Sequence, residues 1–120
     1  MKNEVLENIR SRRSVRAYKP DEVPQDKLRA VLEAGTYAPT GRGRQSPTII
    51  AVKSADCRAR LSKLNAAVMG RDVDPYYGAP VIVLVLADPS VNTWVEDGTC
   101  VLENLMLAAH SVGLATVWVH

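Results

Sequence analysis

Apolar residues recur at helical spacing in the first third of the chain. One stripe predicts a surface helix over residues 3–11 that packs on one side only. A second stripe predicts a helix that begins near Pro24, a favoured first helical residue, and ends at Gly35, a favoured C-terminal cap. The apolar positions of the two stripes are Val5, Leu6, Ile9, Leu28, Val31 and Leu32.

Continuous apolar runs indicate the strands. Residues 48–52 are β-branched and apolar, which predicts a buried strand. Residues 80–86 are the clearest strand, since six apolar residues follow one proline and imply burial on both faces. Residues 114–119 predict a third strand. Helices that alternate with strands indicate an α/β layered fold, whose strand order the pattern leaves open.

Two further helices are predicted between these strands. Ser54 is a suitable N-cap for a helix over residues 55–64, and residues 65–77 are expected to be irregular. Thr93 begins a capping-box pattern for a long helix. Residues 101–109 of that helix are apolar nearly all round, as in a helix buried in a domain or in a subunit interface. The residues expected to face inward from the shorter helix are Leu61 and Leu64.

Composition and charge limit the kinds of protein that this chain can be. With 120 residues, 47% hydrophobic and 23% charged, the chain is expected to form a single domain over residues 1–120. The formal net charge of +2 is low for a dedicated nucleic-acid binder. No signal peptide and no apolar run of membrane-spanning length is present, so a cytoplasmic location is expected. Cys57 and Cys100 lack metal-ligand spacing and are interpreted as free, buried thiols.

A basic cluster follows the first helix. Residues 10–16 hold four arginines and two serines. Arginine forks match phosphate oxygens in bidentate fashion, and serine hydroxyls add short donors, so this cluster is suited to hold one phosphate monoester. A solvated basic turn is the alternative that composition leaves open.

A second unusual segment is the loop over residues 38–47, called the glycine loop below. Its two glycines and two prolines indicate a defined shape. Backbone N–H groups next to glycine can approach an anion or the edge of a flat ring closely. The alternative is a plain connector between a helix and a strand, although ten residues is long for a connection.

The common catalytic constellations are not recognisable in the sequence. There is no acid pair, metal-ligand set, nucleophile–base pair or P-loop, and the GxG of residues 41–43 lacks the third glycine of a dinucleotide-binding fingerprint. His110 is interpreted as a core histidine, and Glu103 as a carboxylate that is paired structurally or faces solvent. A phosphate-friendly and a ring-friendly loop without catalytic side chains indicate a protein whose chemistry is carried by an organic cofactor.

Four segments resemble motifs of the nitroreductase family of flavoproteins. Residues 10–18 (RSRRSVRAY) resemble its RRSVRxF/Y entry motif, and residues 38–45 (APTGRGRQ) resemble its AP(S/T)xxNxQPW loop. Residues 77–83 resemble the xxAPVVIVV strand, and residues 103–118 resemble the ENLxLAAxxxGLGxCW stretch. The motifs occur in the family's order and cover nearly the whole chain.

The resemblance implies a three-layer αβα sandwich with a small, mainly antiparallel central sheet. It also implies a homodimer with FMN at the subunit interface, reduced by NADH or NADPH, that passes electrons to nitroaromatic, quinone or similar acceptors. The implied contacts to the flavin phosphate and ribityl chain are Arg12, Arg13, Ser14 and Arg16. The implied contacts to the flavin ring are Pro39, Thr40, Gly41 and Gly43 of the other subunit, together with Asn65 as a donor to the ring edge.

The chain also departs from the family pattern. Gly43 stands where the family has asparagine, and Ser46 and Pro47 stand where it has Pro-Trp, so one contact to the flavin edge and one packing aromatic are expected to be missing. Family members continue well beyond the tryptophan strand, so the chain ending at His120 is expected to be truncated. One alternative function is therefore a dimeric domain that binds flavin or nucleotide poorly and is catalytically weak or inactive. Another is a small nucleic-acid binder that uses the arginines.

Overall fold

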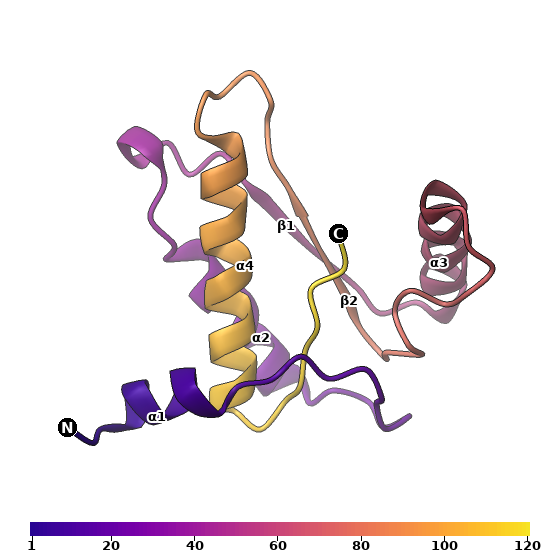
Figure 1. The fold of residues 1–120 in the computed structure, drawn as a ribbon, viewed down its shortest axis with the longest axis horizontal. Helices are drawn as coiled ribbons and strands as arrows, with labels where there is room; N and C mark the ends of the chain where they lie inside the picture. The colour runs from indigo at the N-terminus through magenta and orange to yellow at the C-terminus, as the bar shows by residue number, and fades with distance from the viewer.

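A computed structural model describes all of residues 1–120. Two helices begin the chain, and from the second of them onwards helices and strands alternate (Figure 1). The elements are α1 Glu4–Ser11, α2 Gln25–Thr36, the 3₁₀ turn η1 Gly41–Gly43, β1 Thr48–Val52, α3 Ala55–Met69, β2 Ile82–Leu86 and α4 Trp94–Ser111. The mixed α/β class and the two central strands predicted from the sequence are confirmed. Their predicted burial is wrong, because β1 has no buried residue and Ile82 is the one buried residue of β2 in so small a sheet. None of the helices has both the length and the apolar character that a bilayer span requires.

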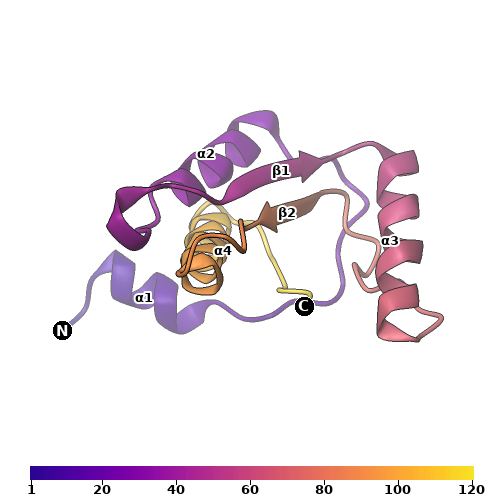
Figure 2. The same cartoon turned by 90° about the horizontal axis from the view of Figure 1, so that it is seen from above.

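β1 and β2 form the small sheet, and they run antiparallel with Ile50 paired to Leu84. α2 and α4 lie side by side against this pair, while α3 stands apart at the end of the sheet (Figures 1 and 2). Apolar side chains between α2, α4 and the sheet form the core. Its buried members are Val31, Ala38, Val101, Leu105 and Ala109.

Gly35 has a packing role that the sequence did not indicate. α2 continues through it to Thr36, so the prediction that Gly35 caps the helix is wrong. A Cβ at this position would lie 2.8 Å from both Ile49 Cδ1 and Leu105 Cδ2. Glycine is therefore needed because α2 approaches β1 and α4 closely, and not because the chain turns there.

α3 differs in length from the helix predicted over residues 55–64. Its N-cap is Ser54, as predicted, and the Ser54 hydroxyl accepts from the Cys57 N–H at 3.4 Å. The helix then includes residues 65–69, which were expected to be irregular, and it ends at Gly70 in the left-handed conformation. A glycine with positive φ is a usual end of a helix, so the stop signal was present in the sequence five residues further on than expected.

The inward orientation predicted for Leu64 is also wrong. Leu64 is 64% exposed, and Ala66 is the one buried residue of α3. The physical reason is that α3 stands clear of the core, so neither face has much to pack against. For the same reason Cys57, on the first turn of α3, is exposed instead of buried, although both cysteines are free as predicted.

Residues 114–119 do not form the predicted third strand. They make one isolated bridge, between Ser14 and Thr116, in which the Val15 N–H donates to the Thr116 carbonyl at 3.0 Å. An apolar, β-branched segment becomes a strand only where a partner runs alongside it over several residues. Here the N-terminal segment meets it at a single point.

Asp74 organises the turn between α3 and β2. Its carboxylate accepts hydrogen bonds from the Ser62 hydroxyl at 2.8 Å and from the N–H groups of Tyr76 and Gly78 at 3.0 and 2.6 Å. Burial acts to raise the pKa of Asp74, but the three hydrogen bonds and the positive charge of Arg58 together outweigh it and hold this pKa below its ordinary value. The folded state therefore favours the charged carboxylate.

We expect Asp74→Asn to lower the free energy of unfolding by about 1 kcal/mol at neutral pH, because a neutral amide accepts these bonds less strongly and solvent screens the exposed site. A carboxyl with a lowered pKa stabilises the fold fully above its unfolded pKa, and this contribution is lost as the pH falls through its folded pKa. Urea unfolding of the variant and the wild type should therefore differ at neutral pH and converge in acid. Asp72→Asn, in the same turn, is the control, and a difference for Asp74→Asn that is independent of pH would contradict the assignment.

Candidate functional site

The basic cluster begins where the end of α1 contacts the end of α4. Asn8 Nδ2 donates to the Leu107 carbonyl at 2.9 Å, and Ser11 Oγ lies 2.8 Å from His110 Nε2. Because the Ser11 hydroxyl donates to the Glu7 carbonyl at 2.7 Å, its oxygen is left to accept a hydrogen bond from the imidazole. These contacts fasten the start of the cluster to the last turn of α4.

Arg12 carries a guanidinium nitrogen, Nη1, that is buried and has no hydrogen-bond partner. A buried donor left unpaired costs free energy, so such an atom marks a place where an acceptor from a ligand fits. Arg12 lines a small cavity of about 240 Å³. The polar walls of this cavity come from Ser11, Arg12, Arg13, His110 and Thr116. Guanidinium, imidazole and hydroxyl groups around one small space suit an anion such as a phosphate.

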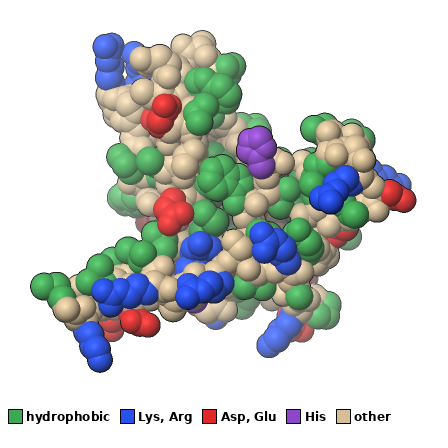
Figure 3. Space-filling model, viewed as in Figure 1, with side chains coloured by type: hydrophobic (Ala, Val, Ile, Leu, Met, Phe, Trp, Pro, Cys, Tyr) green, Lys and Arg blue, Asp and Glu red, His purple; other side chains and the backbone are tan.

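The other residues predicted for the phosphate differ in their placement. Arg13 lines the small cavity, but its Nη1 donates to the carbonyls of Arg10 and Arg12 at 2.6 and 2.7 Å. Ser14 and Arg16 are exposed and lie outside the walls of the cavity. Basic side chains gather along this N-terminal segment, at the lower edge of Figure 3. The structure therefore brings Arg12 and Arg13 into one cavity and leaves Ser14 and Arg16 on the adjoining surface.

His110 belongs to this site, which corrects its interpretation as a core histidine. Its ring is partly buried and lines the same cavity as Arg12. The apolar residues around it on α4 concealed this role. The available signal was its position in the last turn of a helix, where the carbonyl ends favour a positively charged side chain. Glu103, further up the same helix, is exposed.

The glycine loop forms the turn η1 beside the first turn of α4. The Gly41 N–H donates to Asp97 Oδ1 at 2.8 Å, and the Gly43 N–H donates to the Thr40 carbonyl at 3.0 Å. The Gln45 N–H donates to Thr40 Oγ1 at 2.9 Å. The glycine N–H groups are thus engaged within the protein, which contradicts the expectation that they are free to approach an anion.

Asp97 also changes the role predicted for Thr93. The Thr93 side chain makes no cap hydrogen bond, so the predicted capping box is wrong, and its hydroxyl instead donates to Asp97 Oδ2 at 2.9 Å. In the glycine loop, which Asp97 contacts through Gly41, Pro39 is exposed and Thr40 and Gly41 are half-buried. With its N–H groups engaged, the loop can offer a ligand its Cα surface and its side chains.

In a single chain the two halves of the predicted site lie far apart. The glycine loop sits at the beginning of α4 and the basic cluster at its end (Figure 1). Asp97 and His110, which contact the two halves, are about 20 Å apart along the axis, given the rise per residue of an α-helix. One chain therefore does not close both halves around one small cofactor.

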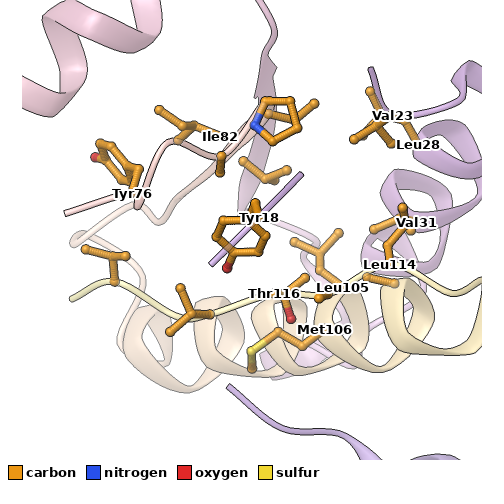
Figure 4. A pocket seen from close by; sticks show the side chains of 18 of the residues that line it. Tyr18, Val23, Leu28, Val31, Tyr76, Ile82, Leu105, Met106, Leu114 and Thr116 are labelled. Atoms are coloured by element: carbon orange, nitrogen blue, oxygen red, sulfur yellow. The ribbon is translucent and has the colours of Figure 1, made fainter. Parts of the chain in front are cut away.

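Asn65 lies away from both halves. It is on α3, where its Nδ2 contacts Met69 Sδ at 3.3 Å. It lines a wide cavity of about 800 Å³ together with Tyr18 and Tyr76, whose side chains are seen in Figure 4. Burial raises the pKa of both phenols.

The walls of the wide cavity are mostly the aliphatic core, including Leu105 and Met106 of α4 (Figure 4). Residues 114–116 form a wall that it shares with the small basic cavity. A ligand site normally combines an apolar wall with a few converging polar groups. The small cavity has such groups, so we assign the candidate anion site to it and not to the wide cavity.

Comparison with known proteins agrees with the resemblance found in the sequence. The model described as the nitroreductase family matches residues 9–120. A protein of Methanothermobacter thermautotrophicus, described as a candidate NADH dehydrogenase/NAD(P)H nitroreductase, is 32% identical over 122 residues, which cover 98% of this chain and 61% of that protein. The chain therefore spans less than two thirds of this relative's length.

Solved structures resemble the chain over nearly its whole length. A nitroreductase with bound FMN from Bacteroides fragilis is 37% identical, with a TM-score of 0.91 over 98% of this chain and 70% of that chain. A nitroreductase with bound FMN from Desulfitobacterium hafniense is 27% identical, with a TM-score of 0.88 over the same shares of 98% and 70%. The match of the family model to nearly every residue, supported by these similarities, shows that the chain belongs to the nitroreductase family.

Proposed function

We propose that this protein binds FMN and acts as an NAD(P)H-dependent flavin oxidoreductase in the cytoplasm. The observation that carries the proposal is the small basic cavity lined by Arg12, a residue whose Nη1 is buried without a hydrogen-bond partner, because a phosphate would supply an acceptor for its guanidinium. Membership of the nitroreductase family, in which solved structures hold FMN, supports the choice of cofactor.

The residues of the chain bind and orient the cofactor in this proposal. Arg12 and Arg13 bind the phosphate in the small cavity, and Ser14 and Arg16 contact the ribityl chain from the adjoining surface. FMN, when bound, supplies the redox chemistry between NADH or NADPH and an acceptor such as a nitroaromatic or a quinone. No side-chain acid is required, so the contribution of the protein to the rate is placement of the reacting groups.

The proposal includes a homodimer in which a second copy supplies the glycine loop. Arg12 and Gly41 lie at opposite ends of α4, so two copies are needed to bring them to one flavin. Asn65 of the first copy is then a donor to the ring edge. The residues that would border the ring from the second copy are Pro39, Thr40, Gly41 and Gly43.

Exposed apolar side chains support this dimer. Val5 and Ile9 on the apolar stripe of α1 are 69% and 50% exposed, and Trp94 and Val95 at the start of α4 are 41% and 54% exposed. Exposed apolar groups of this kind mark interaction sites when they are contiguous. Residues 101–109, which the sequence left as either a core helix or part of a subunit interface, are largely covered inside the chain. The dimer therefore rests on α1 and on the start of α4.

Titration of the purified chain with FMN tests the proposed cofactor. We expect saturable binding, seen as a change in the visible absorption band of the flavin. NADH or NADPH should bleach this band without oxygen, and a nitroaromatic or a quinone should restore it. Riboflavin should bind more weakly because it lacks the phosphate. A chain that takes up no FMN and does not oxidise NAD(P)H would contradict the proposal.

Mixing two defective variants tests whether the site is shared between subunits. Arg12→Ala removes the phosphate contact and Gly41→Val crowds the glycine loop, so each variant alone should bind FMN poorly. A mixed dimer would contain one intact site. Refolding the two variants together should therefore restore about a quarter of the wild-type capacity, because half of randomly formed dimers are mixed. The absence of any recovery would place the whole site within one chain.

A second candidate function is a dimeric domain that binds flavin or nucleotide weakly and turns over slowly or not at all. The wide cavity favours this second candidate. The cavity opens the core beside residues 114–116, and an open core admits water, which a redox site normally excludes. Steady-state oxidation of NAD(P)H in the presence of an acceptor separates the two candidates. Weak flavin binding with little or no turnover would support the second candidate, and tight flavin binding with sustained turnover would exclude it.

A further inference from the structure

A buried carboxylate ties the glycine loop to α4. Asp97 is 3% exposed, and it is the one charged side chain that is buried. Its Oδ1 accepts from the Gly41 N–H at 2.8 Å, and its Oδ2 accepts from the Thr93 hydroxyl at 2.9 Å. Burial of a carboxylate is unfavourable unless its oxygens are hydrogen-bonded. Both oxygens of Asp97 are engaged, and the first turn of α4 adds a favourable helix dipole.

Gly41 and Thr93 are in unusually close contact. A Cβ on Gly41 would lie 2.2 Å from Thr93 Oγ1 and 2.9 Å from Thr93 Cγ2. Thr93 is itself held by Asp97. The three residues form a clamp, called the Asp97 clamp below, in which a Cβ at position 41 would force the Thr93 side chain to move.

The loop beyond the clamp adopts an uncommon backbone conformation. Arg42 and Gln45 have φ angles of 56° and 51°, in the left-handed region that non-glycine residues rarely occupy. Such residues persist only where the surrounding structure holds them. The hydrogen bond from the Gly41 N–H to Asp97 is the one bond that joins residues 39–47 to another element. The remaining hydrogen bonds of these residues join two residues of the loop.

We propose that Asp97 is a positioning residue for the flavin ring, an inference that rests on the proposed function. It fixes the conformation in which Pro39, Thr40 and Gly41 border the ring, and it acts through the Gly41 backbone. Asp97 itself is buried behind the loop and does not touch the cofactor. A loop that is ordered before binding loses less conformational entropy when the flavin enters, so the affinity is higher.

Three variants separate this role from alternatives. Asp97→Ala removes both acceptors of the clamp. Asp97→Asn retains a carbonyl oxygen for the Gly41 N–H and an amide group for Thr93, so it is the conservative rescue. Glu96→Ala removes the neighbouring, exposed carboxylate in the same turn of α4 and is the matched control.

Amide hydrogen exchange of the full chain without flavin is the first readout. Asp97→Ala should accelerate exchange at Gly41 and along the loop by about tenfold, because a lost hydrogen bond to a charged group shifts the local opening equilibrium by that factor. Exchange in α2 and in the second half of α4 should stay unchanged. Asp97→Asn and Glu96→Ala should resemble the wild type. Loop exchange in Asp97→Ala equal to that of the wild type would overturn the proposal.

FMN binding is the second readout. The dissociation constant should rise about tenfold in Asp97→Ala, and the absorption band of the bound flavin should move towards that of free FMN. Asp97→Asn should restore both. Wild-type affinity and spectrum in Asp97→Ala would overturn the positioning role and leave the proposed function standing. A wild-type chain that binds no FMN would instead overturn the proposed function, and the assignment of the loop to a flavin with it.

Gly41→Ala takes the place of Asp97→Ala if that variant does not fold. It retains the carboxylate but crowds Thr93, so it should accelerate loop exchange and weaken FMN binding in the same way. Its melting temperature should stay close to that of the wild type, because the contact lies outside the core. Unchanged loop exchange in Gly41→Ala would overturn the proposal.

Discussion

Replacing Arg12 by alanine is expected to weaken FMN binding about a hundredfold, from the loss of about 3 kcal/mol of charge-assisted hydrogen bonding to the phosphate. The effect is large because Nη1 of Arg12 is already buried and unpartnered, so little solvent competes with the phosphate for it. Quenching of flavin fluorescence on titration measures the change. Arg12→Lys should recover only part of the affinity, since an ammonium group cannot form the planar, two-point contact.

The control for this prediction is Arg10→Ala. Arg10 is exposed in the same cluster and does not line the small cavity, so its loss should change the affinity for FMN by less than about threefold. Riboflavin provides a second check, because Arg12→Ala should leave its binding nearly unchanged. Equal losses for Arg10 and Arg12 would mean that the phosphate is held by diffuse positive charge and not by a defined site.

Leu105→Ala is expected to lower the free energy of unfolding by about 3 kcal/mol, because the change removes buried methyl groups and leaves a cavity. Leu105 is 5% exposed, belongs to the core cluster and faces Gly35 across the contact of α2 with α4. Urea unfolding followed by circular dichroism measures the loss. The melting temperature should fall by about 10 °C for a domain of this size.

Leu64→Ala is the matched control for the core. It is the same substitution within a helix, so the change in helix propensity is shared and the difference between the two variants reports burial. Leu64 is 64% exposed, and its loss should cost less than about 0.5 kcal/mol. A cost as large as that of Leu105→Ala would show that α3 packs against the molecule in solution.

Local patterns predicted those elements that consist of one uninterrupted residue pattern. The strand expected over residues 48–52 is β1, because β-branched apolar residues suit a half-buried pleated strand. The stripe of Val5, Leu6 and Ile9 forms α1. Residues 114–119 carry an equally apolar pattern, yet they form no strand. The difference is the partner, since β1 has β2 alongside it and residues 114–119 have one bridge.

The candidate site was predicted in part, and for a definable reason. Residues 10–16 and the glycine loop were found because their composition is unusual for a surface turn. Asp97 and His110 were missed because each is an ordinary residue of a helix: Asp97 is one of two neighbouring acids in the first turn of α4, and His110 follows an apolar run. Their roles depend on what packs against α4 at its two ends.

By itself the sequence determined the α/β class, both strands and membership of the nitroreductase family, because periodicity and motif spacing are properties of residues close together in the chain. Only the tertiary structure decided that Arg12 has a buried nitrogen without a partner. It alone decided that His110 contacts Ser11 across 99 positions, and that Asp97 holds Gly41 across 56 positions. The physical reason is that the free energy of such contacts depends on distance and burial, which exist only once α4 has packed against α1 and the glycine loop.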